Sequence, residues 1–375
     1  MDSSVRVSVV VPCYNTAAYL DQCLSSIRED HGVSLEIIVL NDGSTDDSLE
    51  IMRAHEAADG RVCVIDKPNQ GYGATVNRGI DEARGDYIAI VEPDDYLVPG
   101  MYTELIGLAD RYGAPDLVRS SYWRVWMPDT PQEHLYRCSY YDRIKPGRMP
   151  FTLIDCPRII QHHPSIWTCL YKRSFLDEFG IRFKEVPGAG WVDNPFLIET
   201  SVQARSIAYT DEAFYCYRED LPGSSSTKRS DTLPFERWND MADIMERLGV
   251  SDKGIIEALY VIGFRYIGGA IGEGALDDPE LVELIQGVFK RMDPSIVAGM
   301  IHVSPSFKKK YFELSGYEPR GISRAPYYKN LISEFFYCWR TNGFMFAMSR
   351  TGGFIKRLAA DHGVGNPSST RSASI

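Results

Sequence analysis

Three acidic side chains stand close together in the segment EPDDYL, residues 92 to 97. Glu92, Asp94 and Asp95 follow residues 87 to 91, an apolar run typical of a buried strand. Adjacent carboxylates repel each other unless a cation or hydrogen-bond donors offset the repulsion. One or two carboxylates, together with phosphate oxygens and water, commonly hold Mg²⁺ or Mn²⁺. The segment therefore favours a divalent metal site, and the alternative is a solvated acidic turn.

A second group of side chains, which could bind a nucleotide, follows two other apolar runs. Tyr14 and Asn15 end the segment VVVPCYN, and Asp42 lies in IIVLNDGSTD. A tyrosine can stack on a nucleotide base, and a carboxylate can accept the N3 hydrogen of uracil. The alternative is that DGSTDD is only a turn that caps a helix.

A third candidate is Asp193 in GAGWVDNPFLIET, residues 188 to 200. A carboxylate in this place can act as a general base that deprotonates a hydroxyl group. Its alternative role is to cap the helix predicted to contain Phe196 and Ile198. Both roles are compatible with the sequence.

The elements that must position these side chains form an alternating pattern. Apolar runs predict strands at residues 7 to 11, 35 to 40, 61 to 65 and 87 to 91, and helical spacing follows the first three. Such alternation predicts an α/β fold with a mostly parallel sheet flanked by helices. Ligands of such sheets bind beyond the carboxyl ends of the strands. Tyr14, Asp42, Asp94 and Asp95 all fall at that edge.

Composition narrows the possible classes. The chain has 375 residues, of which 44% are hydrophobic, and a formal net charge of −11. It can bury a sizeable core, and its acidic balance argues against nucleic-acid binding. The eight cysteines include no CxxC pair and indicate reduced thiols. The apolar run near the N-terminus is too short for a signal peptide, and Arg265 and Arg340 interrupt the longest later stretches. We therefore expect a cytoplasmic protein.

The chain is expected to have two domains. The segment EDLPGSSSTKRSD, residues 219 to 231, is rich in Pro, Gly and Ser and predicts a boundary. Residues 1–230 would form the α/β domain and residues 231–362 a smaller, mainly α-helical domain. Residues 363–375 are small and polar and are predicted to be disordered.

Six segments in this order resemble the family-two inverting glycosyltransferases with a GT-A fold, of the bacterial cell-surface polysaccharide type. They are VSVVVPCYNTAAYLDQCLSSI, EIIVLNDGSTDDS, NQGYGATVNRGIDEARGDYIAIVEPDDYLVPG, the Trp167 to Phe175 segment, GWVDNPF and FYCYREDLPGSSST. The resemblance covers about residues 5 to 230. It implies transfer of a sugar from a UDP-sugar to a hydroxyl of a glycan or a lipid-linked glycan.

The resemblance also implies roles for particular residues. The nucleotide-binding set would be Pro12, Tyr14, Asn15, Asp42, Asn77 and Asp94. Asp95 would be the main ligand of Mn²⁺ or Mg²⁺ with help from Asp94, and Asp193 would be the catalytic base. A loop over the diphosphate would contain Arg218, Ser224, Ser225 and Ser226. Apart from the resemblance, we expect His163, Trp167 and Trp191 on the acceptor side, and the alternative for His163 is a surface position.

The sequence departs from the family pattern at three positions. Glu92 stands where an aspartate is frequent, which keeps a carboxylate. Val192 replaces a frequent glutamate before the expected base, and Val76 replaces an arginine before Asn77. These replacements leave open a catalytically silent nucleotide-sugar-binding or scaffold homologue, and a two-carboxylate glycoside hydrolase is a further alternative.

Two other patterns bear on partners. GYGATV lacks the third glycine of a dinucleotide-binding loop and follows the third predicted strand, which argues against NAD. Residues 301–357 contain ten lysines and arginines against three glutamates, interleaved with aromatic residues. This region predicts a peripheral contact with the inner face of the membrane, and the alternative is a helical domain that exposes its basic residues.

Overall fold

The computed structural model describes residues 5–219, 221 and 232–349. The predicted diphosphate-loop residues Ser224, Ser225 and Ser226, and the predicted tail 363–375, lie outside the described residues. The chain forms two compact units, Met1–Val288 and Phe289–Ile375. Each unit is described by itself.

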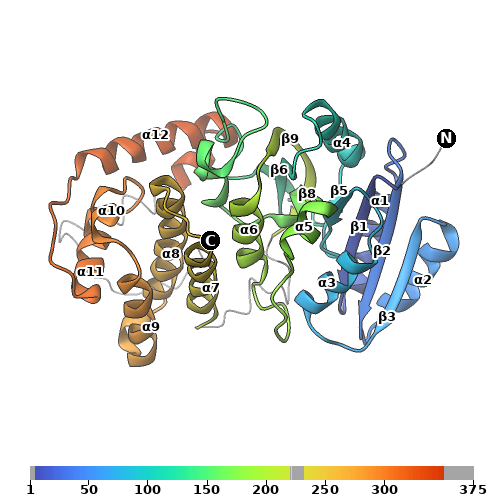
Figure 1. Cartoon of the computed structure of the whole chain (residues 1–375), viewed down its shortest axis with the longest axis horizontal. Helices are drawn as coiled ribbons and strands as arrows, with labels where there is room; N and C mark the ends of the chain where they lie inside the picture. Colours follow the sequence, from blue (N-terminus) through green and yellow to red (C-terminus); the bar gives the residue numbers. More distant parts are fainter. Residues whose placement is uncertain (1–4, 220, 222–231, 350–375) are drawn as a thin grey trace. The chain divides into compact units, whose positions relative to one another are not determined.

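One sheet organises the first unit (Figure 1). Its parallel half has the order β3-β2-β1-β4, built from β1 (Val7–Cys13), β2 (Leu35–Asp42), β3 (Val62–Lys67) and β4 (Tyr87–Ile90). The four strands predicted from apolar runs are thus confirmed. Every residue of β1 and β2 is buried, which explains why their sequences lack polar alternation.

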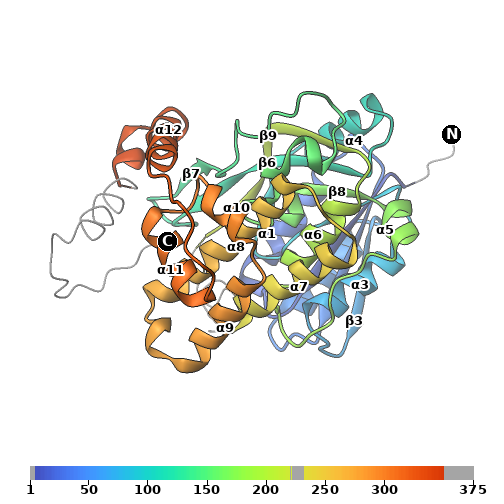
Figure 2. The ribbon, with the colours of Figure 1, turned by 60° about the vertical axis from the view of Figure 1, so that its left-hand side comes forward.

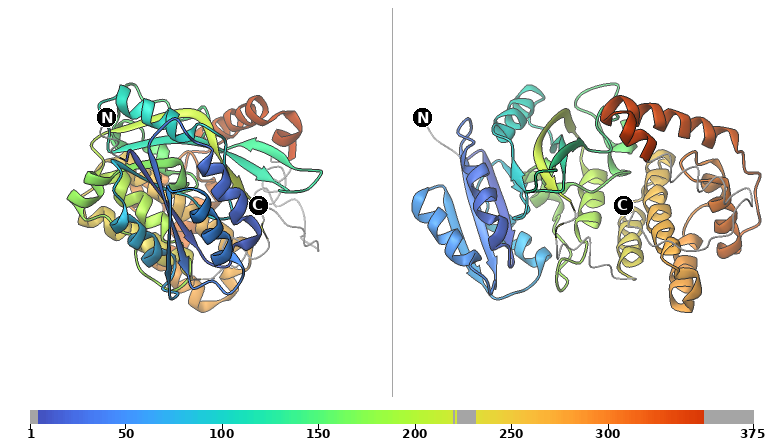
Figure 3. Two further views of the ribbon diagram at one scale, coloured as in Figure 1. Left: turned by 90° about the vertical axis from the view of Figure 1, so that its right-hand side faces the viewer. Right: turned by 180° about the vertical axis from the view of Figure 1, so that it is seen from behind.

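Helices cover both faces of this parallel half. They are α1 (Ala17–Arg28), α2 (Ser48–Ala58) and α3 (Tyr72–Glu82). Right-handed crossovers from β1 to β2 to β3 place α1 and α2 on one face. The return crossover from β3 to β4 places α3 on the other, as the front and back views show (Figures 1 and 3).

The other half of the sheet is mixed, in contrast to the mostly parallel sheet that we predicted. The described strands continue as β4-β8-β6-β9-β5, with β7 paired to β6. These strands are β5 (Tyr96–Leu97), β6 (Leu117–Trp126), β7 (His134–Arg137), β8 (Cys169–Lys172) and β9 (Ile207–Arg218). Strand β8 runs antiparallel to both of its neighbours, whereas β6 and β9 are parallel. A repeated βα pattern specifies only the first half, because β8 and β9 pair with strands far away in sequence.

Shorter elements and helices complete this half. They are α4 (Met101–Arg111), η1 (Leu153–Asp155), η2 (Pro157–Ile160), η3 (Ile166–Thr168), α5 (Arg173–Phe179) and α6 (Asp193–Gln203).

Two helices after the predicted boundary belong to the first unit. Helix α7 (Leu233–Arg247) lies beside α6, and α8 (Lys253–Gly272) lies beside α7 (Figures 1 and 2). Buried Trp238 on α7 donates from Nε1 to the Leu259 carbonyl on α8 at 3.1 Å. The compact units therefore meet at residue 288, not at residue 230, because the apolar faces of α7 and α8 bury themselves against the α/β unit.

Helix α8 is, among the described residues, the one helix long and apolar enough to cross a membrane by length and composition. In this structure 44% of its most apolar window is buried. Its side chains also make polar contacts within the first unit, at Arg265 and Tyr266. These contacts are those of a helix packed into a folded unit.

The unit boundary falls within α9 (Pro279–Lys290), which follows the short η4 (Ala275–Asp277). The second unit continues with α10 (Pro294–Gly299), α11 (Pro305–Ser315) and α12 (Ala325–Asn342). Its small core gathers around buried Tyr311, whose hydroxyl donates to the Met292 carbonyl at 2.8 Å and whose ring meets Phe289 edge to face. None of the side chains of α12 is fully buried.

Candidate active site

The site lies beyond the carboxyl ends of the parallel strands. Strand β1 pairs with β2 from Val7 to Cys13 and with β4 from Val7 to Val10. This register brings the residues after Cys13, the end of β2 at Asp42 and the acidic segment after β4 to one edge of the sheet. The sequence prediction of a shared edge is confirmed.

Asp42 is buried and already engaged at both oxygens. The backbone amides of Gln70 and Gly71 donate to its Oδ1 and Oδ2 at 2.9 and 3.0 Å, and Lys67 forms an ion pair with it. The carboxylate therefore fixes the loop between β3 and α3 at the strand edge. Any contact of Asp42 with a nucleotide would use the remaining lone pairs of these oxygens.

Tyr14 is free to meet a ligand, because 51% of its surface is exposed. Its neighbour Asn15 adopts a left-handed backbone with φ of 53°. The Asn15 side chain accepts a hydrogen bond from the Thr45 amide at 2.7 Å. Asn15 therefore braces the turn after β2, and Pro12 is buried within β1. Of these three predicted nucleotide contacts, Tyr14 and Asn15 are exposed and Pro12 is buried.

Glu92 is a half-buried acid whose pKa is strongly raised. Burial raises its pKa to about 8, and the negative charges of Asp94 and Asp193 add to the shift. The Tyr72 hydroxyl donates to Glu92 Oε1 at 2.5 Å. The folded site thus disfavours a further negative charge at Glu92, and a nearby cation would relieve this.

Asp94 and Asp95 differ in their exposure and in their hydrogen bonds. Asp95 is 1% exposed, and its two oxygens accept from the Tyr215 hydroxyl and the Arg218 amide, both at 2.8 Å. Asp94 is half-buried, and burial raises its pKa. Asp94 is therefore the more accessible carboxylate, and Asp95 fastens the acidic segment to β9.

The acidic segment fits a divalent cation in its chemistry. It offers hard carboxylate oxygens in a buried place where burial raises the pKa of each acid. Within the described ranges there is no group of three or more His, Cys, Asp or Glu side chains that could hold a metal ion. An ion here would take one or two protein ligands, and substrate phosphates and water would supply the rest.

Arg218 ends β9 beneath the acidic segment and is 4% exposed. Its Nη1 donates to the Asp94 carbonyl at 2.7 Å, and its Nη2 donates to Gln22. The guanidinium also lies over the Tyr96 ring at 4.8 Å. We predicted that Arg218 belongs to a loop over a diphosphate. In the structure it is a buried brace, because β9 extends far enough to include it.

Asp193 is the first residue of α6, and the N-cap position belongs to Val192. The carboxylate is therefore not the cap that we considered, and it is half-buried. Burial raises its pKa to about 6, while the amide side chain of Asn194 donates to Oδ1 at 3.1 Å. Its charge also raises the pKa of Glu92 and Tyr72, so these groups share one electrostatic environment. An acid that titrates near neutrality suits a general base.

Two glycines bring the Asp193 loop to the sheet edge. A Cβ atom at Gly73 would lie 2.2 Å from the Lys184 carbonyl oxygen, and one at Gly71 would lie 2.5 Å from that of Val186. The Tyr72 amide donates to the Gly188 carbonyl at 2.9 Å. The GYG segment is thus a packing surface for the chain that leads to Asp193.

Asn77 serves the same junction. Its amide side chain donates to the Phe183 carbonyl at 2.9 Å and accepts from the Phe183 amide at 2.8 Å, and it also donates to Glu185. The amide group is consumed by these bonds. Asn77 thus ties α3 to the segment before Asp193, and its contact with a nucleotide stays a prediction.

The predicted acceptor residues fall into two environments. Trp167 is buried and stacks on Tyr215 at 4.0 Å, and His163 packs against Trp167 at 6.0 Å. Burial lowers the pKa of His163 to about 3, so its ring is neutral at physiological pH. Trp191 is half-buried next to Asp193 and adopts a left-handed backbone with φ of 51°. Trp191 and His163 are thus both partly exposed, whereas Trp167 is buried against β9.

Helix α8 contributes residues that the sequence did not reveal. The Tyr266 hydroxyl donates to Asn194 Oδ1 at 2.8 Å, and its ring lies 5.9 Å from that of Trp191. Exposed Arg265 donates to the carbonyls of Gln161 and His162. We predicted that the residues of α8 belong to a separate helical domain, where Arg265 only interrupts an apolar stretch. The adjacent polar side chains of Arg265 and Tyr266, within an otherwise apolar helix, could have indicated these contacts.

The comparisons agree with this geometry. The family model "Glycosyl transferase family 2" matches residues 8–180. The glycosyltransferase EpsH of Bacillus subtilis is 29% identical over 245 residues, which are 61% of this chain and 65% of the relative. GlyG of Streptococcus pneumoniae is 41% identical over 121 residues, 32% of this chain and 40% of the relative. The chain spans less than two thirds of the length of these curated relatives.

Solved structures show the same fold. The crystal structure of S. aureus TarS residues 1–349 in complex with UDP-GlcNAc has a TM-score of 0.67 and 19% identity, and the match covers 83% of this chain and 88% of that one. This likeness concerns the fold, a GT-A-type α/β unit with flanking helices. The family model over residues 8–180, the curated glycosyltransferase relatives and this fold together support a family-2 glycosyltransferase with a GT-A fold.

Proposed function

We propose that this protein is an inverting, metal-assisted hexosyltransferase that moves a sugar from a UDP-sugar to a hydroxyl of a glycan or lipid-linked glycan. The observation that carries the proposal is Asp193, a carboxylate with a pKa of about 6 that shares its electrostatic environment with the acidic segment. We further propose that it works in the cytoplasm on precursors of the cell envelope.

The donor would bind at the strand edge. Exposed Tyr14 would stack on the uracil ring, and Asp42 would accept the N3 hydrogen while its bonds to the amides of Gln70 and Gly71 keep it in place. TarS, which shares the fold, was crystallised with UDP-GlcNAc. This supports a uridine nucleotide as the first donor to test.

A divalent ion, Mn²⁺ or Mg²⁺, would be held by Asp94, and Asp95 would orient the segment and share in the binding. When bound, the ion would neutralise charge that develops on the leaving diphosphate. Arg218 would hold the Asp94 carbonyl in place from below. Tyr72 would keep the Glu92 carboxyl group in a fixed direction.

The acceptor would approach from the side of Asp193. Its hydroxyl would give its proton to the Asp193 carboxylate while the oxygen attacks the anomeric carbon from the face opposite the diphosphate, which inverts that carbon. Asn194, itself held by Tyr266, would fix the direction of the carboxylate. Trp191 would offer an apolar face to the acceptor sugar.

The test is to incubate the protein with a panel of UDP-sugars, Mn²⁺ and candidate acceptors, and to follow release of UDP. We expect release that depends on one sugar and stops when a chelator is added. Asp193→Asn should lower the rate of transfer by about 10²- to 10⁴-fold while UDP binding persists, and Glu212→Gln, at an exposed carboxylate, is the matched control.

Other outcomes would identify the alternatives. UDP binding without turnover of any donor would indicate a silent binding homologue. Hydrolysis of a glycan without nucleotide or metal would indicate a glycoside hydrolase. Release of UDP that resists the chelator would refute the metal assignment while leaving the transferase assignment standing.

A further inference from the structure

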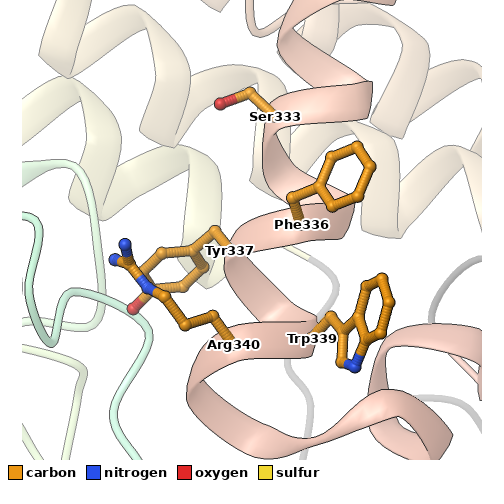
Figure 4. Close-up of a pocket in the computed structure, with 5 residues that line it drawn as sticks. All are labelled: Ser333, Phe336, Tyr337, Trp339 and Arg340. Carbon is orange, nitrogen blue, oxygen red and sulfur yellow. The ribbon is translucent and has the colours of Figure 1, made fainter.

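Helix α12 exposes an apolar stripe. Ile332, Phe336 and Trp339 follow one another at intervals of four and three residues, so they share one face of the helix. They are 61%, 55% and 46% exposed. Figure 4 shows Phe336 and Trp339 projecting from the same side of the helix. Soluble surfaces rarely carry so many large apolar side chains together without a partner.

The stripe continues past the end of the helix. Gly343 follows α12, and exposed Phe344, Met345 and Met348 come next. The Phe344 ring lies 5.4 Å from that of Trp339, and Trp339 stacks on Phe336 at 6.1 Å. The aromatic rings therefore form one continuous exposed cluster, which we call the α12 stripe (Ile332, Phe336, Trp339, Phe344, Met345 and Met348).

The charges around the α12 stripe have one sign. Lys329 and Arg340 are exposed on the same helix, with Arg340 projecting on the side of Tyr337 (Figure 4), and Arg324 immediately precedes the helix. The single acid of α12, Glu334, is half-buried and projects from the opposite side. Between residues 301 and 349 there are seven lysines and arginines and three glutamates, in a chain whose net charge is −11. The stripe is thus a local cationic surface on an acidic protein.

We propose that the α12 stripe binds the surface of a membrane that contains anionic lipids. A helix that lies in the interface buries apolar side chains at the headgroup boundary and places basic residues among anionic headgroups. Tryptophan prefers this depth because its ring is apolar and its N–H is polar. A second protein with an acidic surface would match the charges but would not require the adjoining Phe344, Met345 and Met348. The proposal is independent of the proposed catalytic activity.

The test is co-sedimentation of the full chain with vesicles of phosphatidylcholine alone or mixed with phosphatidylglycerol. We expect binding to the mixed vesicles that falls with added salt. The double variant Phe336→Ser/Trp339→Ser should weaken binding by about tenfold or more, because it removes two aromatic side chains from the interface. Lys329→Gln should weaken it by about fivefold, in line with one charge at an anionic surface.

Matched controls separate this effect from general exposure of apolar groups. Trp126→Ser/Leu135→Ser removes two exposed apolar side chains from paired strands β6 and β7 and should leave vesicle binding unchanged. Brominated lipids should quench the emission of the wild type more than that of Trp339→Phe. Thermal unfolding of each variant verifies that it is folded.

Three results would overturn the proposal. One is equal sedimentation of the wild type and the Phe336→Ser/Trp339→Ser variant. Another is absence of vesicle binding together with a dimer that the same variant abolishes, since a second copy would then occupy the stripe. The third is equal quenching of the wild type and of Trp339→Phe by brominated lipids. Trp339 would then not contact the lipid, and this chain itself would cover the stripe.

Discussion

Replacing Asp193 by asparagine should make the protein more stable and much less active. The burial that raises the pKa of Asp193 from 3.8 to about 6 also penalises its ionised form in the folded state. A shift of about two pH units corresponds to about 3 kcal/mol, and partial exposure reduces this to about 1 to 3 kcal/mol. Asparagine has the same shape but no charge, and its side-chain oxygen can still accept from Asn194.

The sign of this effect depends on pH. Above pH 6 the wild-type carboxylate is ionised in both the folded and the unfolded state, and only the folded state pays for its burial. Below the unfolded pKa near 4 it is protonated in both states. The variant should therefore unfold at a temperature several degrees higher than the wild type at pH 7.5, at about 2 °C per kcal/mol, and the difference should vanish near pH 4.

Activity should move in the opposite direction. Loss of a general base lowers the rate of transfer by about 10²- to 10⁴-fold, with kcat and kcat/KM reduced together. For the wild type, kcat/KM should rise with pH and level off above about 6, because only the ionised form accepts a proton. Differential scanning fluorimetry and UDP release, measured on one preparation at each pH, test both halves. A variant that loses stability along with activity, or keeps full activity, would refute the reasoning.

Three further changes test other parts of the site. Asp94→Asn should raise the Mn²⁺ concentration for half-maximal UDP release by about tenfold or more, and a larger effect of Asp95→Asn would reverse our ranking of the two ligands. Gly73→Ala should destabilise the fold by about 1 to 3 kcal/mol in denaturant melts, since its Cβ would meet the Lys184 carbonyl. Tyr266→Phe should lower kcat about fivefold with the Kd for UDP unchanged, as expected for loss of one hydrogen bond to Asn194, and weaker UDP binding would contradict that role.

The parallel half of the fold was predictable because each of its strands contains a largely apolar run. Strands β1 and β2 are buried along their full length, so their sequences carry a strong local signal. The mixed half carries no such signal, since β8 is a four-residue strand whose neighbours β4 and β6 lie far away in sequence. Pairing of this kind is decided by tertiary packing.

The location of the acidic residues at one strand end was predictable from the sequence. The contacts that each of them makes were not. Sequence placed Glu92, Asp94 and Asp95 at one strand end, but only the bonds from Tyr215 and Arg218 distinguish Asp95 from Asp94. Asn77 was assigned to a ligand because motif position says nothing of its bonds to Phe183. Polar side chains near a site can bind substrate or bind the protein, and the choice depends on distant segments of the chain.

The packing of α7 against α6, and of α8 against α7, determines the shortest fragment of this protein that we expect to fold. A fragment cut at residue 230, where the sequence itself invites a cut, would lose Tyr266 and its bond to Asn194 and would bare the apolar surface that Trp238 and its neighbours cover. Such a fragment should aggregate or bind donor without transferring it. A fragment ending near residue 288 keeps the whole first unit. In such a fragment, α8 could be replaced by the corresponding helix of a relative without changing the strands proposed to bind the donor.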